Sequence, residues 1–294
     1  MHPSPLLGYF LALMAAVTWA VAPVLYRRGV DLISYSGLGA LRCNGYITSA
    51  ALFLFLTMGP SAFAPLPAAT MAKIFVCSVL WLVLGDFFYF SSLHKLGVSI
   101  SVPITSSYPL MVVPAAWIFL GEPAKPMVFV AAALIVAGLV LLSPRKEDQN
   151  EKRQAFSGLA ASFLAMSCWT FGMITNKVLM QTVPVPQLEW WRSVSITLGS
   201  WILFFFLERF RGAASIPRGP MVEMALAGAL GLTVGNLFMT YAFGLAPVDA
   251  VVCIVSIRPF LAALFATLFL GEKLTPRLAG GIVLVFVGVM TITF

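Results

Sequence analysis

The chain has 294 residues, of which 60% are hydrophobic and only 10% are charged. Soluble globular domains carry about 25% charged residues, so this composition excludes a water-soluble fold and indicates a protein embedded in lipid. The formal net charge of +7 does not indicate nucleic acid, because the Lys and Arg residues cluster at the ends of apolar runs, where they act as topology signals and contact lipid headgroups. We therefore expect a lipid bilayer as partner and no nucleic acid.

Apolar runs bounded by charges, Gly and Pro predict ten membrane-spanning helices. They are expected at residues 6–26, 34–58, 71–93, 98–120, 126–143, 157–178, 186–207, 220–243, 248–270 and 276–293. At ~20 residues each, ten spans use about 200 residues and leave no room for a soluble catalytic domain. The expected fold class is all-α integral membrane, and the first span, which no basic residue precedes, is expected to be retained rather than cleaved.

A shift of 150 residues superimposes the first half of the sequence on the second without a gap. The aligned pairs include Gly8 and Gly158, Trp19 and Trp169, Arg42 and Arg192, Gly85 and Gly235, Pro109 and Pro259, and Phe-Leu-Gly-Glu at 119–122 and 269–272. Each half holds an odd number of spans, so the second copy enters the membrane from the opposite side, which predicts two inverted five-helix repeats. We expect the repeats at 6–143 and 157–294, joined by a charged linker at 144–156.

The repeated Phe-Leu-Gly-Glu predicts a tight structural turn. Gly121 and Gly271 can adopt the left-handed conformation that ends the fourth and ninth spans. Glu122 and Glu272 are unfavourable at the negative end of the preceding helix but suit the positive end of the next one, for which Thr275 offers an N-cap.

These repeats, with their tryptophans, arginines and Leu-Gly-Glu motifs, resemble the ten-span drug/metabolite transporter superfamily in its EamA-type branch. The resemblance covers essentially the whole chain. It implies a secondary transporter that exports small organic solutes, such as amino acids or metabolites, by alternating access around a midplane cavity between the repeats. We accordingly expect a multi-pass protein of a prokaryotic inner membrane, with both termini on the same side.

Ionisable side chains at mid-helix in the hydrocarbon cost at least ~2.5–3.5 kcal/mol, so each one is a candidate site residue. Arg258 lies about ten residues into its span, ~15 Å from one end and close to the midplane. It is expected either to bind a substrate carboxylate or phosphate, or to pair with Asp86, the only carboxylate of comparable depth. Asp86 aligns with Asn236 and is also a candidate for proton coupling, because burial makes a lone carboxylate easier to protonate.

Span four places Ser101, Thr105 and Tyr108 on one helix face, which we expect to line the substrate path. Pro109 follows directly, and Pro259 is its counterpart. A proline inside a helix frees the carbonyl four residues back, so both prolines predict kinks that allow the halves to rock. The alternative is that the prolines only shape helix packing.

Aromatic side chains are the remaining candidates for the cavity wall. Trp19, Trp169, Tyr89 and Tyr241 are expected to stack on an apolar or aromatic solute, although tryptophans near span ends also belong to the interfacial belt.

Two arginines lie about two turns into their spans and are candidate gates. Arg192 has a local partner in Glu189, three residues earlier, whereas Arg42 has no comparable neighbour in the sequence.

The distribution of positive charge conflicts with the family resemblance. Connections after the odd-numbered spans hold twelve Lys and Arg residues, and the opposite side holds three: Lys73, Lys125 and Lys177. The positive-inside rule then places both termini outside the cytoplasm, whereas the resemblance implies cytoplasmic termini.

No sequence motif indicates catalysis. The chain lacks G-x-x-x-x-G-K-[ST], H-E-x-x-H and G-x-S-x-G, and its four cysteines show no metal-ligand spacing, so no cofactor, metal site or catalytic residue is expected. Leu84-Gly85-Asp86 resembles an intramembrane aspartyl site, but Val83 replaces the needed glycine and no second deep aspartate is present. The main alternative to a solute transporter is a flippase for lipid-linked or phosphorylated head groups, which would share the fold and open laterally to lipid.

Overall fold

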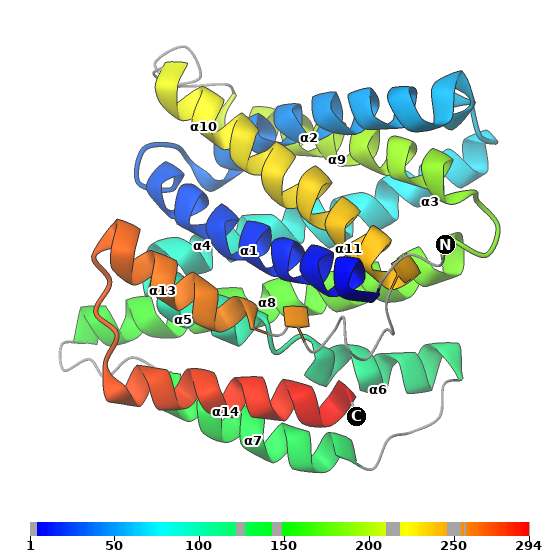
Figure 1. Cartoon of the computed structure of the whole chain (residues 1–294). Helices are drawn as coiled ribbons and strands as arrows, with labels where there is room; N and C mark the ends of the chain where they lie inside the picture. The colour runs from blue at the N-terminus through cyan, green and yellow to red at the C-terminus, as the bar shows by residue number, and fades with distance from the viewer. Residues whose placement is uncertain are drawn as a thin grey trace.

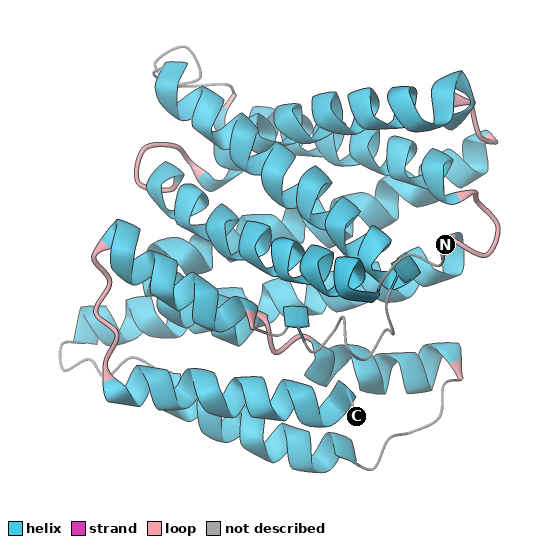
Figure 2. Ribbon diagram, in the orientation of Figure 1, coloured by secondary structure: helices cyan, strands magenta, loops and turns pink. Residues whose placement is uncertain are grey.

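A computed structural model describes residues 5–121, 127–142, 149–209, 218–245, 254–255 and 257–293. Its regular elements are helices, and the described residues contain no strand (Figure 2). The first repeat contains α1 (Pro5–Gly29), α2 (Tyr35–Met58), η1 (Gly59–Phe63), α3 (Ala68–Ser78), η2 (Val79–Leu84), α4 (Gly85–Leu96), α5 (Val98–Thr105), α6 (Pro109–Leu120) and α7 (Met127–Leu142). The second contains α8 (Gln149–Leu179), α9 (Val185–Glu208), α10 (Arg218–Gly228), η4 (Ala229–Val234), α11 (Gly235–Leu245), α13 (Arg258–Leu270) and α14 (Pro276–Thr293).

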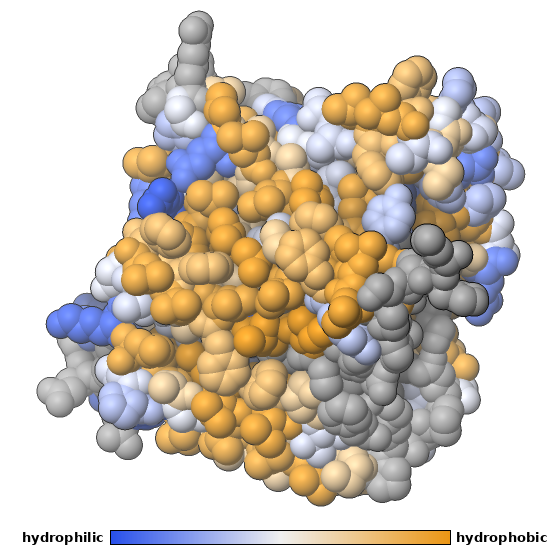
Figure 3. Space-filling model, viewed as in Figure 1, coloured by the Kyte–Doolittle hydropathy of each residue, from blue (hydrophilic) through white to orange (hydrophobic). Residues whose placement is uncertain are grey.

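The lengths of these helices suit a bilayer. Within the described residues, seven helical segments are long and apolar enough to cross a membrane, and three shorter apolar helices accompany them at 129–142, 258–270 and 276–291. Large apolar side chains cover the face shown in Figure 3, and residues such as Phe129 and Leu56 are 81% and 73% exposed. Such a surface is costly in water and favourable in lipid.

The two repeats interlock rather than forming separate bundles. Helix α1 packs mainly against α11 and α13, and its counterpart α8 packs against α4, α5 and α6 (Figure 1). Helices α2 and α9 lie side by side, as do α7 and α14. Each repeat therefore completes its packing with helices of the other. Helix α8 begins at Gln149, inside the predicted linker.

A π-helical turn interrupts the third span of each repeat at equivalent places. The segments are η2 and η4, and each is followed directly by a glycine. A Cβ at Gly85 would lie 2.8 Å from the ring of Trp169, and one at Gly235 would lie 2.4 Å from the ring of Trp19. The absence of a side chain at these glycines makes room for the two tryptophans, so each repeat holds the tryptophan of the other.

Span four is broken rather than kinked. Helix α5 ends at Thr105, a turn covers 106–108, and Pro109 is the first residue of α6. The carbonyl of Thr105 is not left free, because it accepts a hydrogen bond from the backbone N–H of Tyr108 at 3.3 Å. Pro259 is likewise the second residue of α13. The prediction of kinks inside continuous helices is therefore wrong, because both prolines stand in the first turn of a helix. Proline suits this position, since the N–H that it lacks would have no partner within the helix.

The turns after α6 and α13 have the predicted backbone. Gly121 and Gly271 have φ of 69° and 68°, and Thr275 caps α14 by accepting a hydrogen bond from the N–H of Leu278 at 3.2 Å. Glu122 lies outside the described residues.

Glu272 does not cap the helix that follows it. Its carboxylate instead accepts hydrogen bonds from the backbone N–H groups of Val98 and Ser99, at 2.7 and 2.8 Å, at the start of α5 in the other repeat. The prediction chose the right kind of partner, a helix N-terminus, but the wrong helix.

Candidate functional site

A buried ion pair joins the second and third spans of the first repeat. Arg42 on α2 pairs with Asp86 on α4, and their side chains are only 4% and 6% exposed. The indole N–H of Trp169 on α8 donates to the second carboxylate oxygen at 3.1 Å. The suggested pairing of Asp86 with Arg258 is therefore wrong, and Arg42, which has no partner nearby in the sequence, is the residue that pairs with Asp86. The true pair is separated by 44 residues, so no local pattern reveals it.

Aromatic rings surround the Arg42 guanidinium. Its central carbon lies 5.4 Å from the ring centroid of Tyr26 and 5.1 Å from that of Phe90. Cation–π attraction of this kind offsets part of the cost of burying the charge. Sequence analysis missed Tyr26 and Phe90; the signal available for Tyr26 was its alignment, at the repeat offset, with Asn176, which contacts Arg192.

Arg192 has its own partners near one end of the bundle. It pairs with Glu189 in the preceding turn, donates to the amide oxygen of Asn176 at 3.1 Å, and lies 5.1 Å from the ring of Trp81. The local pairing expected with Glu189 is present.

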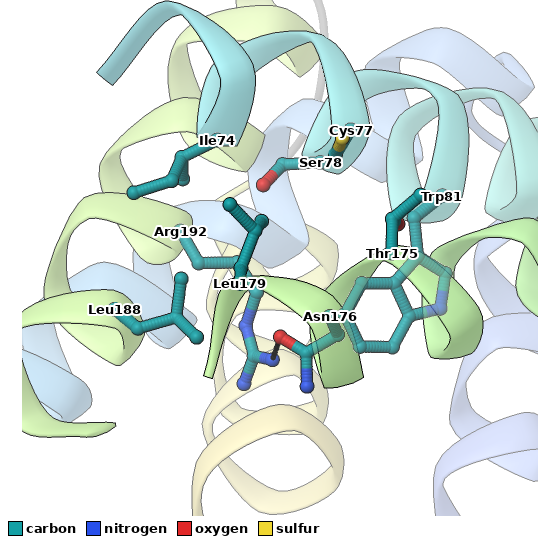
Figure 4. Close-up of a pocket in the computed structure, with 9 residues that line it drawn as sticks. All are labelled: Ile74, Cys77, Ser78, Trp81, Thr175, Asn176, Leu179, Leu188 and Arg192. Carbon is teal, nitrogen blue, oxygen red and sulfur yellow. Dashed lines mark hydrogen bonds between the residues drawn. The ribbon is translucent and has the colours of Figure 1, made fainter. Parts of the chain in front are cut away.

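Figure 4 shows Arg192 beside a small cavity between α3, α8 and α9. The cavity measures about 10 Å³, room for about one water molecule, so it is too small for an organic solute. Its lining residues are Ile74, Cys77, Ser78, Trp81, Thr175, Asn176, Leu179, Leu188 and Arg192.

Arg258 lies where the two repeats meet. It is the first residue of α13, and it is close enough to the hydroxyl groups of Tyr89 and Tyr108 to act on both electrostatically. Tyr108 is its counterpart at the 150-residue offset. Two equivalent residues within electrostatic reach of each other lie near the pseudo-twofold axis, so the region around Arg258 and Tyr108 is the candidate central site.

The guanidinium of Arg258 is incompletely satisfied. Its Nε atom is buried without a hydrogen-bond partner, and within the part of the chain that the structure describes no carboxylate forms an ion pair with it. Its position at a helix N-terminus adds repulsion from the helix dipole. This arrangement suits an anionic group that arrives from outside the protein.

Ser101 and Thr105 belong to helix packing. Both are fully buried. Ser92 lies 2.6 Å from Ser101 and 2.5 Å from Ser162, which joins α4, α5 and α8 through their hydroxyl groups. The hydroxyl of Thr105 donates to the carbonyl of Ser101 at 2.8 Å. Of the three residues predicted on this face, only Tyr108 reaches the neighbourhood of Arg258.

The aromatic candidates separate into three groups. Tyr89 packs edge-on against Trp169 with ring centroids 5.2 Å apart, beside the Asp86 ion pair. Trp19 donates its indole N–H to the carbonyl of Gly231 at 3.0 Å, within η4. Tyr241 is 49% exposed and lies on the outer surface.

Asn236 also differs from its counterpart. Its amide donates to the carbonyl of Leu232, one turn earlier on the same helix, at 2.8 Å. The polar position shared by the two repeats therefore forms an ion pair at Asp86 and a helix-backbone bond at Asn236.

Interlocked inverted repeats in a chain with a lipid-facing apolar surface define a multi-pass membrane protein, and this architecture is typical of transporters. The model of the EamA-like transporter family matches residues 6–143 and 156–294, so the chain belongs to this family. A protein of Archaeoglobus fulgidus named "Uncharacterized transporter" is 25% identical over 287 residues, which cover 97% of each chain. A solved structure titled only "Crystal structure of protein" has a TM-score of 0.65 at 19% identity and covers 97% of this chain and 95% of its own, a likeness that shows the fold alone.

These findings confirm two predictions from the sequence. The protein is an EamA-type transporter, and its fold is the all-α membrane architecture of two repeats. The family to which the chain belongs is one of transporters, and the relative from Archaeoglobus fulgidus is also named a transporter.

Proposed function

We propose that the protein is a secondary exporter of small organic solutes that carry a carboxylate or phosphate, and that it works by alternating access. Arg258 binds the anionic group, and the hydroxyl groups of Tyr89 and Tyr108 orient it. The observation that carries the proposal is a guanidinium near the pseudo-twofold axis whose Nε atom is buried without a hydrogen-bond partner and which forms no ion pair among the described residues. Pro109 and Pro259, in the first turns of α6 and α13, are the proposed hinges beside Tyr108 and Arg258.

The test is uptake of labelled solutes into proteoliposomes by Arg258→Ala. We expect transport of anionic or zwitterionic solutes to fall at least ~100-fold, because a charge-assisted contact worth about 3 kcal/mol is lost. Arg28→Ala, which changes an arginine at the surface, is the matched control and should transport normally. Full activity in folded Arg258→Ala would remove this residue from the site.

The same vesicles test the flippase alternative. Transfer of a lipid-linked or phosphorylated head group between leaflets, without uptake of soluble solutes, would replace the proposed function. Retention of solute uptake without lipid transfer would support it.

Proton coupling through Asp86 is a separate question. The carboxylate already contacts a guanidinium and an indole N–H, and these contacts favour a structural role at this position. We propose that folded Asp86→Asn keeps the pH dependence of uptake; its loss in this variant would assign the coupling proton to Asp86.

We also propose the boundaries and setting inferred from the sequence. The repeats occupy 6–143 and 157–294 with a charged linker between them, and the protein lies in an inner membrane with both termini on the same side. In Figure 1 the beginning of α1 and the end of α14 lie toward the same end of the bundle, which supports this arrangement.

A further inference from the structure

Glu272 connects the two repeats at one end of the bundle. It lies in the connection between α13 and α14, and its two carboxylate oxygens accept hydrogen bonds from the first two N–H groups of α5, at 2.7 Å from Val98 and 2.8 Å from Ser99. Free N–H groups and the helix dipole make a helix N-terminus a favourable site for a carboxylate. Because each oxygen accepts one hydrogen bond, the contact fixes the orientation of the carboxylate and also complements its charge.

The backbone before α5 is shaped for this contact. Gly97 has φ of 78°, a conformation that favours glycine, and a Cβ there would lie 2.8 Å from a carboxylate oxygen of Glu272. Any side chain at this position would therefore both strain the turn and push the carboxylate away.

The two helices joined by this contact are the ones that lead to the centre of the molecule. Helix α13 runs from Arg258 to Leu270, over ~20 Å at 1.5 Å per residue, and ends just before Glu272. Helix α5 begins at the contact and ends at Thr105, three residues before Tyr108. Helices α5 and α13 also pack against each other. The carboxylate of Glu272 thus closes, at one end, the pair of helices whose other ends carry Arg258 and Tyr108.

We infer that Glu272 is the gate residue for the access path on this side of the membrane. While its carboxylate holds the N-terminus of α5, helices α5 and α13 are closed over the central site; when it leaves, α13 moves away from α5 and the site opens toward the α13–α14 connection. This inference rests on the proposed function, because a gate requires a transported solute.

The test measures access to the centre without using a substrate. Ser106, two residues before Tyr108, is replaced by cysteine in a background that lacks the native cysteines, Cys43, Cys77, Cys168 and Cys253. A membrane-impermeant maleimide is then applied from each side of oriented vesicles. Lys273→Cys, which is exposed in the α13–α14 connection, identifies the side on which Glu272 lies.

Glu272→Gln should raise the alkylation rate of the reporter by about tenfold from the Lys273 side only, because it removes charge-assisted hydrogen bonds that hold only the closed state. Glu272→Asp keeps the charge but is one methylene shorter, so it should give a smaller increase. Glu223→Gln is the matched control, because it neutralises a carboxylate at the same end whose ion-pair partner is the side chain of Arg28, 3.6 Å away; it should leave the rate unchanged.

An unchanged rate in folded Glu272→Gln, or an equal increase from both sides, would overturn the gate. If Glu272→Gln does not fold, the same comparison between Glu272→Asp and the parent protein decides the question. The outcome is independent of the transport assay: Arg258→Ala with full uptake would refute the proposed site even where the gate behaves as expected, and a failed gate leaves the uptake result standing.

Discussion

At the scale of single residues, the three arginines within the membrane-spanning helices differ in the partners of their guanidinium groups. Arg42 has a carboxylate, an adjacent indole and two aromatic rings; Arg192 has a carboxylate one helical turn away; and Arg258 has two tyrosine hydroxyl groups nearby. A buried ion pair stabilises little by itself, but removing one partner leaves an uncompensated charge. Arg42 and Asp86 therefore depend on each other, whereas Arg258 forms no ion pair with a carboxylate among the described residues.

Asp86→Asn is expected to lower the stability of the protein by about 3–5 kcal/mol, because the buried guanidinium of Arg42 loses its countercharge. Thermal unfolding of the purified protein in detergent measures the effect. Asp31→Asn, at a carboxylate that is 52% exposed, is the control and should cost no more than ~1 kcal/mol. Similar unfolding temperatures for the two variants would contradict this account of the ion pair.

At the scale of helices, close backbone contacts between the repeats are made possible by glycine. A Cβ at Gly228, the last residue of α10, would lie 2.0 Å from the carbonyl oxygen of Arg42 on α2, and one at Gly45 would lie 1.7 Å from the carbonyl oxygen of Ala225. Backbone atoms cannot rotate away as a side chain can, so the two helices would have to separate.

Gly228→Ala is therefore expected to destabilise the protein by about 1–3 kcal/mol, the usual cost of overpacking. Gly219→Ala, on the same helix, has open space around the added methyl group and should be neutral or stabilising by up to ~1 kcal/mol, since alanine is the better helix former. The unfolding temperatures of the two variants and of the parent protein, measured in detergent, test both expectations. Equal changes in the two variants would show that the α2–α10 contact at Gly228 does not limit which side chain can stand there.

The elements also show what the sequence can and cannot specify. Apolar runs predicted the spans, the 150-residue offset predicted the repeats, and Gly121 and Gly271 have the predicted backbone. The partners of Asp86 and Glu272 could not be predicted, because each is contacted by a residue on another helix far away in sequence. The break at Ser106 was missed because a proline at the start of a helix and a proline inside one have the same local sequence.

At the scale of the whole molecule, the approximate symmetry is broken where function is expected. Equivalent positions hold Asp86 and Asn236, and Tyr108 and Arg258. The repeated backbone supplies two equivalent routes to the centre, and the unequal side chains give that centre one positive charge. A symmetric site would instead place two like charges on the axis, where they would repel each other.

Charge also predicts how the molecule is oriented. The connections on the side of Lys273 hold most of the Lys and Arg residues, so we expect Lys273→Cys to react with an impermeant maleimide only from the cytoplasm and Ala69→Cys, near the other end, only from outside. Labelling of intact cells and inverted vesicles measures this. The reverse pattern would show that the charge count fails for this chain and that the termini are cytoplasmic.

The interlocking of the repeats has a consequence for biosynthesis. Trp19 packs beside Gly235, and the principal neighbours of α1 are α11 and α13. When the first half of the chain has been synthesised, α1 therefore lacks its packing partners until the second half has been inserted into the membrane. Two fragments divided at the charged linker should therefore be degraded when produced singly and accumulate together when co-expressed.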